Sequence, residues 1–359
     1  MHARQYTARA RIALRNPAPV IAEFCDHMQE HNAEVSEGPT GPLLRLGSIR
    51  AQFSREGEAT LVDVAAPDLE GLYLARMAVA SHILEFAGDD PPAITWTGDG
   101  GEIGRPPNFQ ILEVVACRTL TPHMRRLTLS GENVARFAGL DALHLNLMVQ
   151  RPEAGEPQWP HVGANGVIAW EKPELRPLMR KYTVRSVDLA AGTLDIDFVL
   201  HADAGPGSGF AAAAAVGDRV GVVGPGGGGL VAADWYLFAG DETALPAIAR
   251  MLENLSAGAR GRVFIEVEDA GEVQALAPPP AVAVEWLFRD GRPAGSTSLL
   301  IDAVRSVAFP MDGEAVYVWA GCEFEAFRAI RSFARQERRL SNTEHLVVSY
   351  WRRGRAEED

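Results

Sequence analysis

The segment RPLMRKYTVR, residues 176–185, places an arginine, an aromatic ring and a hydroxyl within four consecutive positions. Its pattern favours a β-strand, on which Arg180 and Tyr182 share one face and Thr183 points to the other. A guanidinium can hold a phosphate, a ring can stack on a flat ligand, and a hydroxyl can hydrogen-bond it. The segment suits a flat ring system with a phosphate tail, and a solvated strand with a surface tyrosine is the alternative.

The residues around this segment predict a β-barrel. Short, β-branched stretches separated by turn residues are typical of an antiparallel barrel. We therefore expect a barrel domain over residues 108–232. The stretches are FQILEVVACRTL (109–120), MRRLTLSG (124–131), LHLNLMV (143–149), TLDIDFVLH (193–201) and RVGVVGP (219–225).

The pattern changes after residue 232. Strand-like WYLFAG (235–240) precedes helix-like ALPAIARMLENLS (244–256), and the alternation continues to HLVVSYW (345–351). Alternating strands and helices predict a parallel sheet covered on both faces. Residues 233–359 are therefore expected to form an α/β domain.

Residues 1–100 read as a separate α+β domain in the order β-α-β-β-β-α. YTARARIAL (6–14) alternates like a strand, and residues 18–32 and 68–88 have helical apolar spacing, the second opened by Asp68 as an N-cap. Gly, Pro and Asp are frequent near residues 97–107, which favours a linker there.

Composition excludes several classes of protein. The 359 residues include 34 basic and 47 acidic ones, a formal net charge of −13, which argues against general binding of nucleic acid or anionic membranes. No apolar run reaches the roughly 18 residues of a membrane helix. Three widely spaced cysteines exclude a disulfide framework. Asn16 and two prolines interrupt any signal-peptide core, so a cytoplasmic protein is expected.

RPLMRKYTVR resembles the flavin signature of the siderophore-interacting protein family, a branch of the ferredoxin-reductase-like flavoproteins. Further segments resemble the same family in the same order, and residues 1–100 resemble a small domain of undefined role joined to such proteins. The segments are LTPHMRRLTLSGENVARF (120–137), HLNLMV (144–149), DIDFVLHADAGPGSGFAAAAAVGD (195–218), GDETALPAIARMLENL (240–255) and YWRRGR (350–355).

The resemblance implies FAD held by the barrel, with Arg180 on phosphate, Tyr182 stacked on the isoalloxazine and Thr183 bonded near N5. Independently, Ser208 before an alanine-rich run reads as an N-cap opening a short helix, which would suit a pyrophosphate. The family usually has Ala-Ser-Trp-Ala where this chain has Gly207-Ser208-Gly209-Phe210, so a glycine stands at the position of the family's tryptophan. The remaining implied cofactor-binding residues are Arg185, Asp197, Phe198, Val199, His201 (alternatively a buried structural histidine), Gly205, Gly207, Asp241, Glu242, Thr243 and Ala244.

The substrate implied by the resemblance is a ferric siderophore, an anionic chelate that needs cations beside the flavin. Arg352 and Arg353 near the C-terminus are the candidates, with Arg355 beside them. The family often has a lysine where this chain has Asn146. Arg328 and Arg331 could meet an NADPH phosphate or form a solvated helix face.

Two other patterns do not support a site. Residues 224–229 satisfy GxGxxG, but the residues after them do not open a helix, so we reject a Rossmann fingerprint. His27 and His31 share a helix face but lack a third ligand nearby, so no metal site is expected.

The sequence thus favours a cytoplasmic FAD-dependent ferric-siderophore reductase that uses NADPH, NADH or reduced ferredoxin and releases Fe(II). A flavin takes a hydride pair and returns electrons singly, so we expect no catalytic side chain. The alternatives are a flavin reductase for another acceptor and a non-enzymatic siderophore-binding protein. The siderophore, the oligomeric state and the role of residues 1–100 stay open.

Overall fold

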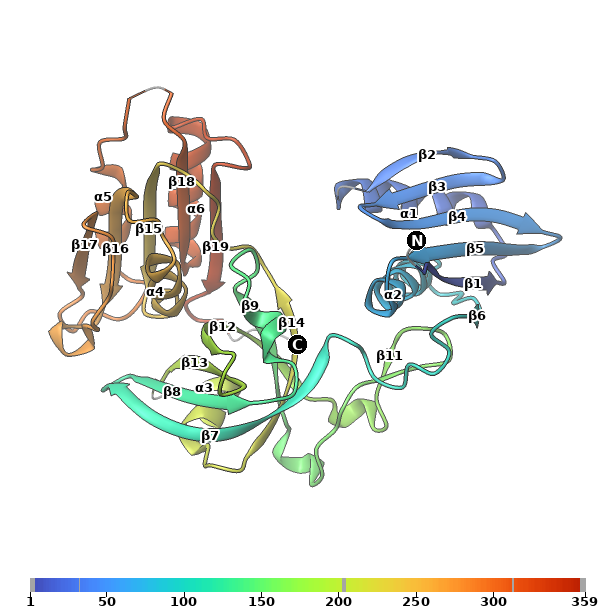
Figure 1. The fold of residues 1–359 in the computed structure, drawn as a ribbon, viewed down its shortest axis with the longest axis horizontal. Helices are drawn as coiled ribbons and strands as arrows, with labels where there is room; N and C mark the ends of the chain where they lie inside the picture. The colour runs from blue at the N-terminus through green and yellow to red at the C-terminus, as the bar shows by residue number, and fades with distance from the viewer. Residues whose placement is uncertain (1–3, 32, 202–204, 312, 356–359) are drawn as a thin grey trace. The chain divides into compact units, whose positions relative to one another are not determined.

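The computed structural model describes residues 4–31, 33–201, 205–311 and 313–355 (Figure 1). The chain divides into two compact units. One unit comprises residues 1–109 with 152–176, and the other comprises residues 110–151 with 177–359.

The first unit contains a six-stranded antiparallel sheet and two helices within its described residues, which confirms the α+β prediction. The strands lie in the order β2-β3-β4-β5-β1-β6. The elements are β1 (Tyr6–Ile12), α1 (Pro17–Glu30), β2 (Glu34–Gly38), β3 (Gly41–Leu46), β4 (Ile49–Glu56), β5 (Ala59–Ala66), α2 (Leu69–Phe86) and β6 (Ile94–Gly98).

Two strands of this sheet depart from the predicted order. β2 was not predicted because EVSEG is short and polar, as suits an edge strand with one exposed face. β6 was not predicted because its five residues follow two prolines and precede a glycine-rich run, so they read as linker. The strand continues to Gly98, and the linker therefore starts after it.

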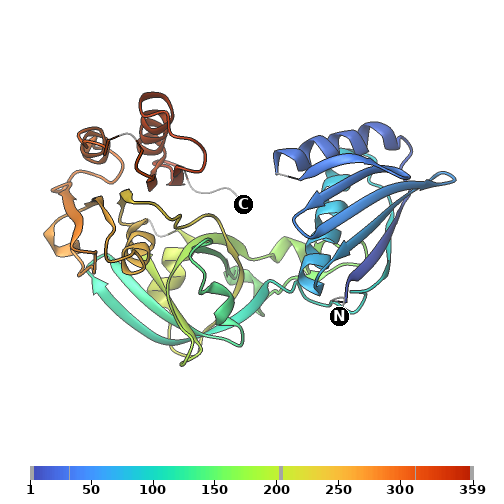
Figure 2. The same cartoon turned by 45° about the horizontal axis from the view of Figure 1, so that its top comes forward.

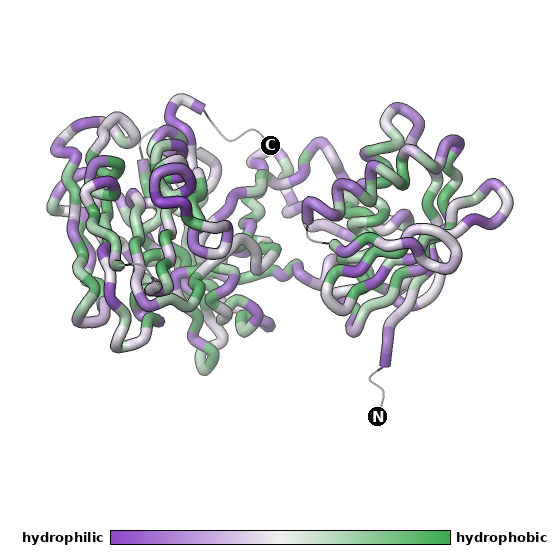
Figure 3. Tube along the Cα trace, turned by 90° about the horizontal axis from the view of Figure 1, so that it is seen from above, coloured by the Kyte–Doolittle hydropathy of each residue, from purple (hydrophilic) through white to green (hydrophobic). Residues whose placement is uncertain are grey.

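Both helices cover one face of the sheet, and the other face is open. Ala8, Ala10 and Ile12 of β1 point into the core, while Thr7, Arg9 and Arg11 point outward. Figure 3 colours the trace by hydropathy, and hydrophilic and hydrophobic residues alternate along much of it. As predicted, Asp68 caps α2 by accepting a 2.7 Å hydrogen bond from the Gly71 amide. Packing of the helices therefore leaves a polar sheet surface available to solvent.

The segment between β9 and β12, residues 152–176, groups with the first unit and not with the barrel. Trp96 Nε1 donates a 2.8 Å hydrogen bond to the Asn165 carbonyl, and Val167 packs against the core of the N-terminal sheet. The segment includes the short hairpin β10 (His161–Val162) and β11 (Ile168–Ala169). The sequence did not predict this grouping, because contacts across 69 residues leave no local pattern.

The second unit begins with a closed antiparallel barrel, as predicted (Figures 1 and 2). The barrel core is formed by apolar residues from its strands and from α3. The strand order is β12-β13-β8-β7-β14-β9, and the elements are β7 (Phe109–Thr121), β8 (Met124–Ser130), β9 (His144–Val149), β12 (Leu178–Asp188), β13 (Thr193–Val199), α3 (Pro206–Ala213) and β14 (Arg219–Gly226).

The glycine-rich run 224–229 ends β14 and does not open a helix, which confirms the rejection of a Rossmann fingerprint. Its glycines allow close approach: a Cβ at Gly229 would lie 1.9 Å from the Leu140 carbonyl oxygen. Gly227 has φ +77°, and a Cβ there would lie 2.6 Å from His144 Nδ1. The run therefore serves packing around β9.

A five-stranded parallel sheet completes the second unit, as the alternating pattern predicted. α4 packs on one face, and α5 and α6 pack on the other. The strand order is β17-β16-β15-β18-β19, and the elements are β15 (Trp235–Asp241), α4 (Leu245–Glu253), β16 (Arg260–Val267), β17 (Ala281–Phe288), α5 (Leu299–Arg305), β18 (Val316–Glu323), α6 (Phe324–Ser332) and β19 (His345–Trp351).

Buried polar contacts join the barrel to this sheet. Arg250 of α4 donates to the carbonyls of Val184, Phe137 and Gly139 at 2.8, 2.6 and 2.9 Å. Glu272, also buried, accepts from the backbone amide of His123 at 3.1 Å. These contacts join α4 to β12 and the segment after β16 to the β7–β8 turn. Among the described residues, the helices all fall short of the length and apolar character that crossing a bilayer requires.

Candidate functional site

β12 presents its polar side chains on two faces, as the sequence predicted. Arg180 and Tyr182 are half-buried on one face, and Lys181 is exposed while Thr183 is buried on the other. β12 pairs with β9, so Thr183 lies opposite His144 and Lys181 opposite Asn146. The strand thus carries a guanidinium and an aromatic ring on one face, and an ammonium and a hydroxyl on the other.

Tyr182 lies between the barrel core and the first turn of α3. Its ring centroid is 4.3 Å from that of Phe198. A Cβ at Gly207 would lie 2.0 Å from the Tyr182 hydroxyl, so any larger residue at that position would displace the ring. Two segments that the sequence assigned to one ligand are therefore in direct contact.

Ser208 does not cap α3, which corrects the sequence prediction. The helix begins at Pro206, and Gly205 occupies the N-cap position in an extended conformation. Proline suits the first helical position because its φ is already fixed and its missing N–H needs no partner, so the helix starts two residues earlier. Ser208 is therefore the third residue of the helix, and its buried hydroxyl has no hydrogen-bond partner among the described residues.

The side chains of Asp197 and Phe198 in β13, both predicted to bind the cofactor, make contacts within the barrel instead. Asp197 accepts two hydrogen bonds from Arg126 of β8, at 2.6 and 2.8 Å, and Phe198 is fully buried in the barrel core. Val199 is half-buried and His201 is exposed, so His201 is not the buried structural histidine of the alternative reading. Contact between a ligand and Phe198 would have to be through backbone. Residues 202–204 of the predicted pyrophosphate segment lie outside the described residues.

Asp241 ends β15 at the carboxyl edge of the parallel sheet and is buried. One carboxylate oxygen accepts from the Thr243 amide and hydroxyl, and the other accepts from Trp351 Nε1 at 2.8 Å and the Glu323 amide at 3.2 Å. Burial and the neighbouring Glu242 raise the pKa of Asp241 to about 6, against the hydrogen bonds, which lower it. At neutral pH the carboxylate is ionised and fastens the end of β19.

Three other residues predicted to bind the cofactor have side chains that are buried or hydrogen-bonded within the protein. Glu242 forms a double hydrogen bond with the buried Arg289, at 2.6 and 2.8 Å. Ala244 is fully buried at the start of α4. Arg185 forms a double hydrogen bond with Glu253 of α4, so it links the barrel to the sheet.

A hydrogen-bonded chain that the sequence analysis missed runs from β12 to β19. The Tyr350 hydroxyl is hydrogen-bonded to the Thr183 hydroxyl and, at 2.6 Å, to His144 Nε2. Burial and the nearby Lys181 and Arg250 charges lower the pKa of His144 to about 4, and burial raises the pKa of Tyr350. Both groups are neutral at physiological pH, so the chain holds Thr183 in one orientation.

The C-terminal arginines directly follow the end of β19. Arg353 donates its backbone amide to Glu323 at 3.0 Å, and the Arg352 guanidinium lies 4.3 Å from the Phe324 ring centroid. Both side chains are exposed. Lys181 opposite Asn146 adds a cation that the sequence analysis did not single out, because cross-strand register is not visible in one strand.

The residues around α3 fit the phosphate-bearing cofactor implied by the sequence. Within the part of the chain that the structure describes, the buried Ser208 hydroxyl makes no hydrogen bond, and burying such a group costs free energy unless something hydrogen-bonds it. The first turn of the eight-residue α3 also leaves backbone N–H groups without intrahelical partners. Ser208 and this turn can hold a pyrophosphate, with Arg180 and Tyr182 on the adjoining strand.

The remaining motifs do not add a site. His27 lies against His31 and His82, with ring centroids 4.7 and 4.4 Å apart, but the described residues hold no group of three or more His, Cys, Asp or Glu side chains arranged to bind a metal ion. Cys322 is buried at the end of β18, and burial raises the pKa of its thiol. It is therefore a packing residue in this sheet.

Comparison with known families assigns each part of the chain. Residues 113–229 match the siderophore-interacting FAD-binding domain, and residues 233–354 match the siderophore-interacting protein family. Residues 9–97 match a family described as an uncharacterized protein conserved in bacteria.

Individual relatives are similar over the same region. The ferric vibriobactin reductase ViuB of Vibrio cholerae is 33% identical over 252 residues, 69% of this chain and 91% of that one. The NADPH-dependent ferric-chelate reductase of Escherichia coli is 33% identical over 189 residues, 51% of this chain and 72% of that one. The crystal structure of a siderophore utilization protein from T. fusca is 41% identical, with a TM-score of 0.63, and covers 70% of this chain and 95% of that one.

Proposed function

The chain belongs to the siderophore-interacting protein family, and on that premise we propose that it reduces the iron of a ferric siderophore with electrons from NADPH or NADH, through FAD, and releases Fe(II). Bound FAD would supply the ability to accept a hydride pair and return electrons one at a time. The proposed reaction takes place in the cytoplasm.

The observation that carries this proposal is the Ser208 hydroxyl, buried and unpartnered in the first turn of α3, beside Tyr182. A protein that held no phosphate there would leave this group without compensation. Arg180, Tyr182, Thr183 and Ser208 are the residues that we propose hold the cofactor. Their side chains would fix its phosphate and ring ends.

The rest of the site supports an anionic substrate. Lys181, Arg352 and Arg353 are exposed cations on β12 and at the end of β19. Lys181 lies opposite Asn146 and so supplies a positive charge on the neighbouring strand. These cations would attract a ferric chelate that carries net negative charge.

Support for a nicotinamide donor comes from the name of the Escherichia coli relative, an NADPH-dependent ferric-chelate reductase. Arg328 and Arg331 of α6 are both exposed, and their guanidiniums lie 5.8 and 5.5 Å from the ring centroids of Phe324 and Phe327. They are the proposed contacts for the nucleotide phosphate. Reduced ferredoxin is the other donor to try.

An anaerobic absorbance titration tests the proposal. The purified chain, loaded with FAD, receives NADPH and then a ferric hydroxamate together with an Fe(II) trap. Bleaching of the flavin bands, followed by their return as trapped Fe(II) appears, is expected. Flavin that bleaches but passes no electrons to the chelate would move the assignment to another acceptor. A protein that FAD cannot reconstitute would leave only siderophore binding.

A double variant tests the cofactor residues. Arg180→Ala with Tyr182→Ala is expected to abolish FAD retention while the far-UV circular dichroism spectrum stays unchanged. Met179→Ala is the matched control, because Met179 is an exposed residue of the same strand, and it should purify yellow. Equal flavin content in the double variant would show that the cofactor lies elsewhere.

A further inference from the structure

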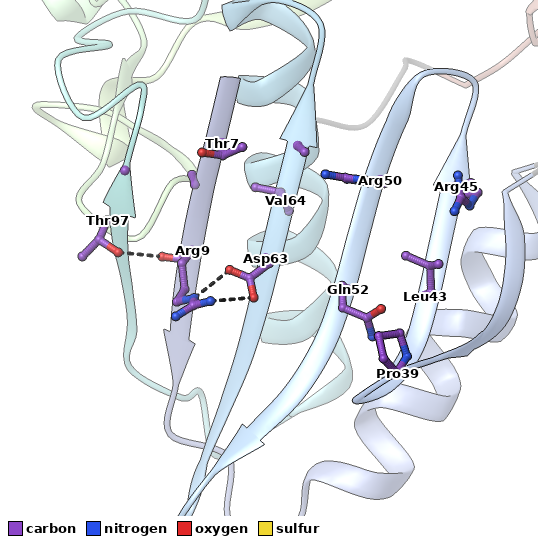
Figure 4. A pocket seen from close by; sticks show the side chains of 13 residues that line it. Thr7, Arg9, Pro39, Leu43, Arg45, Arg50, Gln52, Asp63, Val64 and Thr97 are labelled. Atoms are coloured by element: carbon purple, nitrogen blue, oxygen red, sulfur yellow. Dashed lines mark hydrogen bonds and ion pairs between the residues drawn. The ribbon is translucent and has the colours of Figure 1, made fainter. Parts of the chain in front are cut away.

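The open face of the N-terminal sheet carries a cavity of about 730 Å³ that the proposed reaction does not use (Figure 4). Helices α1 and α2 lie behind the sheet, so the cavity is lined by outward-facing side chains of its strands. They include Arg9, Leu43, Arg45, Arg50, Gln52 and Asp63. The volume lies within the range of roughly 300–1,000 Å³ that is typical of small-molecule sites.

Two arginines of this cavity occupy paired positions on neighbouring strands, and neither has an acidic partner among the described residues. Arg45 of β3 and Arg50 of β4 are register partners in an antiparallel hairpin. Within the described part of the chain neither forms an ion pair, and the only polar contact found for the Arg50 side chain is a 3.3 Å hydrogen bond to Gln5. Like charges directly opposite each other on a sheet are destabilising. The hairpin therefore carries two positive charges that do not stabilise its fold.

The other charges of this face are neutralised. Arg9 forms a double hydrogen bond with Asp63, at 2.6 and 2.9 Å, and Arg11 pairs with Glu56. Glu34 lies opposite Arg45 in register on β2, yet makes no ion pair with it in the described structure. The net positive charge is thus concentrated on Arg45 and Arg50, although acidic residues are available nearby.

The neutral lining suits an organic skeleton between charged groups. Gln52 is held in place because its amide donates to the carbonyls of Gly41 and Phe53, both at 2.9 Å. Leu43 and Pro39 supply apolar surface beside it. The residues that line the cavity come from strands and turns, without the helix N-terminus that many phosphate sites use.

We infer that this face binds a polycarboxylate, each guanidinium taking one carboxylate in a two-pronged hydrogen bond while the carbon skeleton lies on Leu43 and Gln52. The ligand is either a free di- or tricarboxylate or the ferric chelate of one, since both present paired carboxylates. This site is distinct in its residues from the site proposed for FAD, and its existence does not depend on the reductase activity.

Isothermal titration calorimetry of the FAD-loaded full chain with citrate tests the inference. All proteins in this titration carry Arg352→Gln and Arg353→Gln, so that the C-terminal cations do not contribute to citrate binding. Arg45→Gln with Arg50→Gln is expected to weaken binding at least tenfold. Arg45→Lys with Arg50→Lys should retain part of the affinity, because charge is kept and the forked hydrogen bonds are lost. Binding should weaken as salt rises, because the site is exposed.

Arg55→Gln is the matched control: Arg55 is an exposed arginine of the same strand that does not line the cavity, and its loss should leave binding unchanged. Ferric citrate binding more tightly than citrate would identify the chelate as the ligand, and the reverse would identify the free acid. Inorganic phosphate binding more tightly than either, or equal citrate affinity in the Arg45/Arg50 variant, would overturn the inference. In the otherwise unchanged chain, Arg45→Gln with Arg50→Gln should leave flavin bleaching by NADPH the same as in the wild type, so a failure here leaves the reductase proposal untouched.

Discussion

Two arginine–aspartate pairs of almost the same geometry occur in the two units of this protein. Arg9 and Asp63 are register partners in the N-terminal sheet, with hydrogen bonds of 2.6 and 2.9 Å. Arg126 and Asp197 are register partners in the barrel, with hydrogen bonds of 2.6 and 2.8 Å. Their side chains are 56% and 43% exposed in the first pair, but 15% and 2% exposed in the second.

The two pairs differ in burial, and burial determines how much stability is lost when one residue of a pair is removed. An exposed pair exchanges its partners with water, so either residue can be lost at small cost. A buried pair leaves an uncompensated charge when one partner is removed. The barrel and parallel sheet therefore use polar contacts to fix a site in place, whereas the N-terminal face keeps its charges accessible.

Replacing Arg126 should give the largest effect. Arg126→Ala strands the buried Asp197 carboxylate, and we expect a loss of about 3–5 kcal/mol in the free energy of unfolding. Urea unfolding of the purified variant measures it. Joint replacement as Arg126→Met with Asp197→Leu should recover most of the loss, and a single variant as stable as the wild type would contradict the comparison.

The second prediction concerns pH. The pKa of Asp241 is raised to about 6 in the folded protein, chiefly by burial, so the folded state binds its proton more tightly than the unfolded state does. Protonated Asp241 therefore stabilises the folded state, and this contribution is complete below about pH 4. It is lost as the pH rises toward 6, which lowers the free energy of unfolding by about 3 kcal/mol. Asp241→Asn lacks this titration.

The stability difference between wild type and Asp241→Asn should therefore shrink from pH 4 to pH 6 and then stay constant. Thermal unfolding of both proteins between pH 4.5 and pH 8 measures it. A wild-type advantage that grows with pH would mean that the four hydrogen bonds to the carboxylate outweigh its burial.

Ser208→Ala should have opposite effects on the two states of the barrel. Without cofactor, removal of an unpartnered buried hydroxyl leaves the stability unchanged or slightly higher. With FAD, the loss of one hydrogen bond to a charged phosphate is expected to weaken binding roughly tenfold. Flavin fluorescence quenching measures the affinity, and Ser36→Ala in the N-terminal sheet is the control that should not change it.

Arg9→Ala should give the smallest effect, below about 1 kcal/mol, because its pair with Asp63 is exposed. A double-mutant cycle with Asp63→Ala measures the coupling and is directly comparable with the same cycle on Arg126 and Asp197. Coupling as large as that in the barrel would show that the N-terminal face is covered in solution.

The sequence predicted elements best where the hydrophobic pattern was regular. The barrel strands and the alternating strands and helices after residue 232 were all anticipated. EVSEG and ITWTG, the edge strands β2 and β6, were not, because short strands with few buried residues resemble turns. The start of α3 was wrong by two residues because Pro206 at the first helical position outweighed the capping preference of Ser208.

The sequence named polar residues for the proposed site, but it did not predict which side chains they pair with. Asp197, Arg185 and Glu242 are where the sequence placed them, yet each is paired with a residue 47 or more positions away. His144 and Tyr350 lie in predicted strands and in segments that resemble the family, but the sequence did not single out either residue. Their hydrogen bond spans 206 residues, and no local pattern signals it.

The sequence by itself determined the fold class of each region and the segment that carries the flavin signature, because periodicity and short motifs depend on residues close together in the chain. Only the tertiary structure decided which charges are neutralised and which stay available. That difference depends on strand register and burial, which pair Arg126 with Asp197 and leave Arg45 beside Arg50. Residues on neighbouring strands are far apart in the sequence, so which charged side chains form ion pairs is decided only when the strands pair in the folded protein.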